Sequence, residues 1–233
     1  SLACHTDLWM PDHGKPSALA DALNVTRLLP PARGAMETLG AITPAVAART
    51  GLAPTTRVVC GIHDSNASLL PFLARATPPF TVVSTGTWVV LLHVGGATAR
   101  LDPFADMLAN VDALGRPVPC AKFMGGREFA TLAEGDAPPD AGLVDVLLAQ
   151  PVLALPAFTD QGGPYAGRAG RVIGELPNQP GARATLASLY AALMTDDLLT
   201  RLDAKGPVIV DGQFGRNPVY CSALAGLRAA QSV

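Results

Sequence analysis

The chain has 233 residues, of which 49% are hydrophobic and 15% are charged, and its net charge is −2. This composition supplies a buried core and excludes an intrinsically disordered chain. The 17 Lys and Arg residues form no basic stripe, so we expect no nucleic-acid partner. No apolar run approaches the roughly 20 residues that cross a bilayer, and the first residues lack a signal-peptide pattern. We therefore expect a soluble, cytoplasmic protein without a membrane partner.

The first 56 residues read as short helices separated by proline-rich turns. One helix is predicted from Ala18 to Leu23. A second has the N-cap and N1 pattern at Thr43 and Pro44 and stops at Gly51. By themselves these segments predict helical packing and no chemistry.

A first polar turn follows the β-branched run from Arg57 to Cys60, which predicts a strand. The turn contains His63, Asp64, Ser65 and Asn66, and helix-like spacing returns from Ala67 to Ala74. The carboxylate of Asp64 is thus placed between a strand and a helix, where α/β sheets usually bind ligands. An aspartate in this position is also commonly a helix N-cap, and both interpretations stay open.

A second polar turn lies between two apolar strands, Phe80–Val83 and Trp88–His93. Its residues are Ser84, Thr85, Gly86 and Thr87. They offer three hydroxyls and backbone N–H groups that a ligand can approach closely, which suits a phosphate. Thr77, Pro78 and Pro79 mark a linker before the hairpin, and we place a domain boundary near residue 75.

Beyond the hairpin, the block KFMGGREF at 122–129 leads into a helix. Two interpretations of this block stay open. It is either the start of a helix whose solvated face carries Arg127 and Glu128, or a functional segment. Arg127 is given no catalytic role. Residues 159–181 are too rich in Gly and Pro for a long helix or a central strand. Apolar residues spaced by three and four then predict an amphipathic helix from Ala184 to about Leu202.

Near the end of the chain, a buried strand at Pro207–Val210 meets the turn D-G-Q-F-G-R-N at 211–217. Pro218 is well placed to begin a helix after it. A glycine turn and a helix N-terminus present backbone N–H groups and the positive end of a helix dipole. This pattern favours a nucleotide phosphate or ribose.

The cysteines, at positions 4, 60, 120 and 221, lack the CxxC spacing of metal or redox sites, and we expect buried free thiols. His63 and Asp64 form an HD pair, but the sequence has no clear set of further ligands. We therefore predict no protein metal site. His5 and Asp7 form a polar pair near the start of the chain and are assigned no role.

Two motifs in close succession, G-I-H-D-S-N-A-S at 61–68 and V-V-S-T-G-T-W at 82–88, resemble the core of the FGGY family of carbohydrate kinases. The nearest branch is that of rhamnulokinase and fuculokinase. The resemblance implies an α/β, ribonuclease H-like (actin-like ATPase) fold. It also implies that Asp64 is the catalytic base, that His63 and Asp64 bind the sugar, and that Thr85, Gly86 and Thr87 bind the ATP phosphates.

The family has a glycine-rich adenosine-binding turn that corresponds to 211–217. The resemblance extends in outline to Gly212, Gly215 and Asn217, and it makes Gln213 a candidate for the adenine pocket together with Phe214. This sequence departs from the family's run of adjacent glycines. The adenine contacts therefore rest on the resemblance alone.

The resemblance covers the whole chain, whereas the chain covers only about half of the family's architecture. Residues 1–74 correspond to the C-terminal portion of the FGGY N-terminal domain, ending in the catalytic Asp turn and helix. Residues 75–233 correspond to the C-terminal nucleotide-binding domain, truncated at its C-terminal helices. The D-x-G-T phosphate motif that opens the family's fold does not occur.

We expect a kinase that uses ATP and Mg²⁺ to phosphorylate a hydroxyl of a small sugar, a ketopentose or a 6-deoxyketohexose such as L-rhamnulose or L-fuculose. The isolated chain should be an incomplete enzyme, and homodimerisation is left open. The alternatives are a non-catalytic sugar or nucleotide sensor on the same fold, and an α/β domain without small-molecule chemistry.

Overall fold

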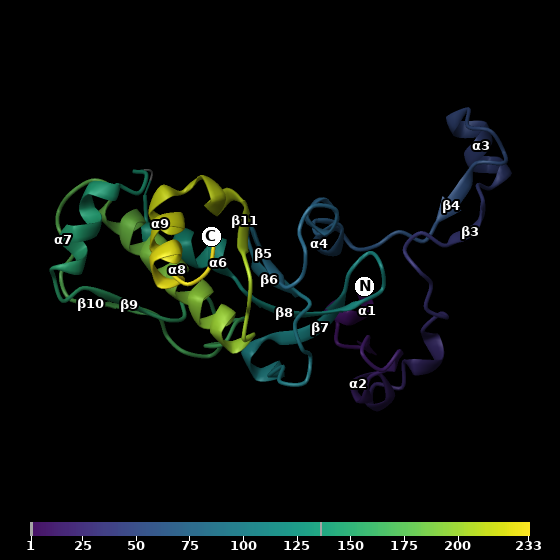
Figure 1. Cartoon of the computed structure of the whole chain (residues 1–233), viewed down its shortest axis with the longest axis horizontal. Helices are drawn as coiled ribbons and strands as arrows, with labels where there is room; N and C mark the ends of the chain where they lie inside the picture. Colours follow the sequence, from purple (N-terminus) through teal and green to yellow (C-terminus); the bar gives the residue numbers. More distant parts are fainter. Residues whose placement is uncertain (1, 136) are drawn as a thin grey trace. The chain divides into compact units, whose positions relative to one another are not determined.

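The computed structural model describes residues 2–135 and 137–233. The described chain packs into two compact units. Unit 1 comprises the residues up to Arg75 together with Ala109–Pro117, and unit 2 comprises Ala76–Leu108 with Val118–Val233. Figure 1 follows the chain through both units by colour. Within the described residues, no helix has the length and apolar character needed to span a membrane.

Unit 1 is built from short elements. They are α1 (Leu2–His5), β1 (Trp9–Met10), β2 (Lys15–Pro16), α2 (Ala18–Ala22), η1 (Thr26–Leu28), β3 (Thr38–Ala41), α3 (Pro44–Thr50), β4 (Arg57–Val59), α4 (Asp64–Ala67) and α5 (Leu70–Leu73). The two helices predicted from capping patterns are confirmed. Ser17 caps α2, and α3 begins after the N-cap Thr43 and ends at Gly51, which has φ 73°. These caps satisfy backbone N–H groups that have no partner within the helix.

The strand before the first polar turn differs from the prediction, because it does not enter a large sheet. In the described chain, β4 pairs with β3 as a two-stranded antiparallel ribbon. Every residue of both strands is exposed. Cys60, which follows β4, is also exposed, so the expectation of a buried thiol is wrong there. The β-branched run indicated a strand but carried no information on its partner.

Unit 2 is organised around a five-stranded mixed sheet of order β11-β5-β6-β8-β7. Its elements are β5 (Phe80–Thr85), β6 (Val89–Val94), η2 (Pro103–Ala105), β7 (Met107–Val111), β8 (Pro117–Phe123), α6 (Gly125–Ala133), η3 (Ala141–Leu143), α7 (Val144–Leu148), β9 (Leu153–Leu155), β10 (Arg171–Ile173), α8 (Ala182–Arg201), β11 (Val208–Gly212), η4 (Gln213–Arg216) and α9 (Pro218–Leu227). Residues 109–117, which include the end of β7 and the turn before β8, belong to unit 1. β11 pairs with β5 in parallel, whereas β5–β6 and β6–β8 are antiparallel.

The long helix α8 contributes more buried residues to the described core of unit 2 than any other element, in keeping with its apolar spacing. Leu186, Tyr190 and Leu198 of this helix are buried in one cluster with Val83 and Leu91 of the sheet. Figure 1 shows α6 and α9 beside α8, and both helices pack against it. Burial of an apolar helix stripe against a sheet is the main favourable term in such a unit.

The predicted hairpin is present, with its boundaries shifted. β5 continues through Ser84 and Thr85, and the turn consists of Gly86, Thr87 and Trp88, closed by a hydrogen bond from the Gly86 N–H to the Trp88 carbonyl at 2.9 Å. Trp88 is therefore a turn residue, although its sequence pattern predicted a strand. Its ring packs under the ammonium of Lys122, 5.1 Å from the ring centroid.

Of the two interpretations left open for the KFMGGREF block, the structure contradicts the one that places Glu128 on a solvated face. Its side chain is fully buried, because the buried positions of α6 are Gly125, Glu128 and Leu132, one helical stripe. The carboxylate accepts hydrogen bonds from the hydroxyls of Tyr190 and Thr159. Burial, with a further contribution from this carboxylate, raises the pKa of Tyr190. The polar cluster joins α6, α8 and the loop after β9.

Candidate functional site

The first polar turn places Asp64 at the first residue of α4, not at its cap. The N-cap is His63, whose Nδ1 accepts the Ser65 N–H at 3.4 Å. The Asp64 side chain is 91% exposed. Within the described chain, its contacts all use Oδ1, which accepts the Ser65 N–H at 2.6 Å and lies 3.1 Å from His63 Nδ1. Oδ2 is thus left available to accept a proton from a bound hydroxyl.

The two turns assigned to the nucleotide are joined by Thr85. Its hydroxyl donates to the Asp211 carbonyl at 2.7 Å and accepts the Phe214 N–H at 2.9 Å. The parallel pairing of β5 with β11 places Gly212 opposite Thr85, so the Thr85 hydroxyl lies within reach of both backbone groups. The Thr85 side chain is buried and its hydroxyl is already engaged. Thr85 thus holds the glycine turn and does not present its hydroxyl to a phosphate, in contrast to the expectation from the sequence.

Gly86, in contrast, has open space at the position where a Cβ would project. A Cβ at this position would meet only the Trp88 carbonyl oxygen, at 3.9 Å, and its φ lies outside the left-handed region. Neither packing nor backbone strain therefore requires glycine at position 86. The adjacent Thr87 is exposed. The turn thus leaves its backbone accessible to a ligand that approaches closely.

Two other glycines allow the surrounding elements to meet. A Cβ on Gly126, in the first turn of α6, would lie 2.1 Å from the Gly86 carbonyl oxygen. A Cβ on Gly212 would lie 2.1 Å from the Thr85 carbonyl oxygen. Both distances are impossible contacts, so glycine is required for α6 and β11 to pack against the hairpin. The hairpin turn, the start of α6 and the 211–217 turn are thereby brought together.

A pocket of about 310 Å³ opens beside these turns. Its lining residues are Gly126, Phe129, Pro138, Pro139, Gln213, Phe214, Arg216, Asn217 and Pro218. Its volume lies at the lower end of the range for small-molecule sites, and its mixture of apolar rings and a few polar groups is typical of them. Among these residues, Gln213 and Asn217 were predicted from the sequence. Gly126 and Phe129 were not, because the KFMGGREF block gave no sign of its spatial neighbours.

The side chains of Phe214 and Asn217 have structural roles within this pocket. Phe214 is buried and packs on Phe129 and Tyr220, with ring centroids 5.5 and 4.9 Å apart. Asn217 caps α9, accepting the Tyr220 N–H at 3.1 Å and donating to the Ser188 hydroxyl at 2.8 Å. Gln213, Gly212 and Gly215 are exposed. The structure therefore offers a ligand the backbone of the turn and the Gln213 side chain.

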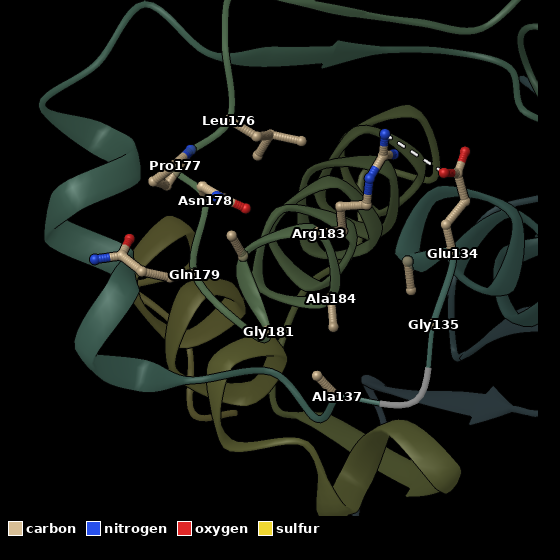
Figure 2. Close-up of a pocket in the computed structure, with 12 residues that line it drawn as sticks. Glu134, Gly135, Ala137, Leu176, Pro177, Asn178, Gln179, Gly181, Arg183 and Ala184 are labelled. Atoms are coloured by element: carbon tan, nitrogen blue, oxygen red, sulfur yellow. Dashed lines mark ion pairs between the residues drawn. The ribbon is translucent and has the colours of Figure 1, made fainter.

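A larger cavity of about 380 Å³ lies at the N-terminus of α8 (Figure 2). Its charged lining residues, Glu134 and Arg183, point toward each other and form an ion pair at 3.4 Å. None of the residues singled out in the sequence lines it. The smaller pocket is the better candidate, because the predicted 211–217 turn lines it and Gly126, which also lines it, closely approaches the hairpin turn at Gly86.

Metal ligands do not gather in the described part of the chain. Within residues 2–135 and 137–233, no three His, Cys, Asp or Glu side chains lie together as a metal site. The His63–Asp64 pair therefore has no third such side chain beside it, among the described residues, with which to form a metal site.

A known protein family matches this chain. The profile described as "Carbohydrate kinase FGGY, C-terminal domain" matches residues 77–233. No curated protein sequence matches the chain.

Solved structures extend the match beyond that domain. A carbohydrate kinase from Novosphingobium aromaticivorans is 38% identical, with a TM-score of 0.83, over 99% of this chain and 52% of that one. A xylulose kinase from Rhodospirillum rubrum is 22% identical (TM-score 0.65; 92% of this chain, 46% of that one), and a gluconate kinase from Lactobacillus acidophilus is 16% identical (0.68; 91% and 46%). This chain therefore spans about half the length of these proteins. The matches confirm the predicted ribonuclease H-like, actin-like ATPase fold.

Proposed function

The chain belongs to the FGGY family of carbohydrate kinases, and on that premise we propose that it carries the nucleotide site and the catalytic base of an ATP-dependent sugar kinase. The observation that supports this most strongly is that the start of α6 and the 211–217 turn line one pocket, and that Gly126 of its lining closely approaches the hairpin turn at Gly86. Phosphoryl transfer depends mostly on positioning and on charge stabilisation, which rigidly placed backbone N–H groups supply.

In the proposed nucleotide site, the backbone of Gly86 and the exposed Thr87 contact the ATP phosphates. Gly212, Gln213 and Gly215 contact the nucleoside through the 211–217 turn. Thr85 and Asn217 act on the nucleotide by holding this turn, since their polar atoms are bound within the protein. Mg²⁺ neutralises the phosphates when ATP is bound, and we assign it no ligand in this chain.

In the proposed sugar site, Asp64 is the general base. Its Oδ2 accepts the proton of the sugar hydroxyl as the hydroxyl oxygen attacks the γ-phosphorus of ATP; the bond from the γ-phosphorus to the bridging oxygen breaks, and ADP leaves. Oδ1 is held by the Ser65 N–H. His63, adjacent to it, binds the sugar. We assign residues 1–74, which include Asp64, to the C-terminal portion of the FGGY N-terminal domain, and residues 75–233, which include the nucleotide turns, to the C-terminal domain.

We propose a ketopentose or a 6-deoxyketohexose as the sugar, with L-rhamnulose or L-fuculose favoured by the likeness of the 61–68 and 82–88 motifs to that branch of the family. The proposed reaction takes place in the cytoplasm, where ATP is available, and a homodimer is compatible with it. A panel of L-rhamnulose, L-fuculose, xylulose and ribulose, assayed for ADP release by the complete kinase that contains this sequence, tests the proposal. Release of ADP with one ketose supports it.

The alternative function is a sugar or nucleotide sensor without catalysis. It is favoured by one observation, the departure of D-G-Q-F-G-R-N from the family's adjacent glycines. A sensor would bind a ketose and MgADP, seen as a rise in Tm, and would release no ADP from ATP with any sugar of the panel. The same panel therefore separates the two functions.

A further inference from the structure

The helix that carries Asp64 is too short to fix its own orientation. α4 consists of four residues, and its N-cap hydrogen bond, from the Ser65 N–H to His63 Nδ1, is long at 3.4 Å. One turn of helix is marginal in water, because nucleation fixes several dihedrals for a single hydrogen bond. The orientation of the His63–Asp64 pair must therefore come from contacts with other parts of unit 1.

Asn66, in the middle of α4, makes one set of these contacts. Its side chain is fully buried. Its amide nitrogen donates to the Asn110 side-chain oxygen at 2.7 Å and to the Val111 carbonyl, and its amide oxygen lies 2.9 Å from His5 Nε2. Buried amides are held by such bonds, since leaving one unmade costs about 1–3 kcal/mol. Asn66 thereby attaches α4 to the end of β7 and to His5.

His5 makes the second set of contacts, and it reaches His63 directly. The two imidazole rings have centroids 4.4 Å apart and planes inclined by 48°. His5 Nε2 also lies 2.9 Å from the Asn110 amide nitrogen. His5 is therefore fixed on one side by two buried amides and packs on the other against the ring that touches Asp64.

We propose that His5 is a positioning residue for the catalytic pair: its ring sets the plane of the His63 ring, and His63 in turn holds the Asp64 carboxylate. The proposal rests on the proposed role of Asp64 as base. His63 Nδ1 lies 3.1 Å from Asp64 Oδ1, a distance at which a protonated Nδ1 donates to the carboxylate in place of accepting the Ser65 N–H at 3.4 Å. A rotation of the His63 ring would remove this bond and leave Oδ1 held by Ser65 alone. A small displacement of a catalytic group can cost about 10²-fold in rate.

Two variants separate the ring contact from the hydrogen bonds. His5→Phe keeps an aromatic ring against His63 but cannot bond to Asn66 or Asn110. His5→Gln keeps a polar partner for those amides but removes the ring. His13→Ala is the matched control, since His13 belongs to the same unit and its side chain is 55% exposed.

The first measurement uses the 233-residue chain and does not require activity. The chain has only four histidines, so their ring resonances can be assigned by NMR. We expect His5→Gln to shift the His63 Nδ1 nitrogen resonance, which responds to its hydrogen bond, by more than the loss of the His5 ring current alone can produce, while the resonances of buried His93 stay in place. His5→Phe should shift it less, and His13→Ala should leave it unchanged. A shift no larger than the ring-current effect in His5→Gln overturns the proposal.

The second measurement is made in the complete kinase. We expect His5→Gln to lower kcat about 10- to 100-fold with an unchanged KM for ATP, and His5→Phe to stay within a few-fold of the parent. If His5 only stabilised the fold, the loss of kcat in each variant would be proportional to its loss of Tm. If His5→Phe is the slower variant, or if both keep the parent's kcat, the proposal is wrong. If the parent releases no ADP with any sugar, the proposed function fails, and the NMR shifts alone decide whether His5 orients His63.

Discussion

The hydroxyl of Thr85, at the end of β5, accepts the backbone N–H of Phe214 at 2.9 Å and donates to the Asp211 carbonyl at 2.7 Å. One side chain thus connects the β5–β6 hairpin to the 211–217 turn. Thr85→Val removes both bonds in a buried position and should lower the free energy of unfolding by about 1–3 kcal/mol. The affinity for ADP should also fall, because the 211–217 turn loses the two hydrogen bonds that hold it to Thr85.

Thr85→Ser is the matched control for this prediction, since it keeps the hydroxyl. Urea unfolding and ADP titration of both variants check it. If Thr85→Ser loses as much stability and ADP affinity as Thr85→Val, the methyl group of Thr85 matters and its hydroxyl does not.

Gly86→Val should weaken nucleotide binding while the fold survives. The Cβ has room in the free protein, where its nearest neighbour lies 3.9 Å away, so the added side chain occupies space that we assign to phosphate. We expect at least a tenfold rise in the Kd for ADP, about 1.4 kcal/mol, at a Tm close to that of the parent.

Gly126→Ala provides the contrast for Gly86→Val. Its Cβ would lie 2.1 Å from the Gly86 carbonyl oxygen, so this smaller substitution should lower Tm more. Unchanged ADP affinity in Gly86→Val would remove the hairpin from the nucleotide site.

Acid should destabilise unit 2 through His93. This side chain is 2% exposed, its Nδ1 lies 3.0 Å from the Thr81 hydroxyl, and its Nε2 accepts the Lys205 N–H at 3.4 Å. Burial lowers the pKa of His93 in the folded protein. The unfolded chain, with a histidine pKa of about 6.5, therefore binds the proton first. The stabilisation from neutral His93 is complete above that pH and is lost as the pH falls below it.

Urea unfolding at pH 7 and pH 5 measures this effect. The free energy of unfolding should fall between the two, and His93→Gln should reduce the fall. If the free energy of unfolding falls by the same amount between pH 7 and pH 5 in the parent and in His93→Gln, the acid sensitivity comes from other groups.

The 233 residues should not phosphorylate a sugar by themselves. They span about half the length of the carbohydrate kinases they resemble, and we expect the remaining half to contribute to sugar binding. The purified chain should bind ADP in a titration and release none from ATP in the presence of the ketose panel. ADP release by this chain alone in the presence of a ketose would contradict the expectation that the remaining half is needed for sugar phosphorylation.

The elements that the sequence predicts well are those set by local signals. The caps of α2 and α3, the apolar stripe of α8 and the hairpin of β5 and β6 all follow from residues within one turn or one strand. The order of the five strands in the sheet does not, because it is decided by packing between distant segments.

The candidate site was only partly predictable, for the same reason. Asp64 and the three turns stand out by residue type. The engagement of the Thr85 hydroxyl does not, since its partners lie 126 and 129 residues away. Burial of Glu128 was missed because a charged residue on a helix is usually exposed, and its partner Tyr190 is 62 residues distant. His5 was passed over because nothing in the local sequence indicates its contact with His63.

The role of Asp64 is the central claim, and Asp64→Asn tests it most directly. Asn retains an oxygen that can accept the Ser65 N–H, and the cap of α4 belongs to His63, so the variant should fold as the parent does. What it loses is the basic oxygen. In the complete kinase, the account predicts a fall in kcat of about 10²- to 10⁴-fold, with Tm and ADP affinity close to those of the parent. An Asn variant that turns over within a few-fold of the parent would contradict the assignment of Asp64 as the base.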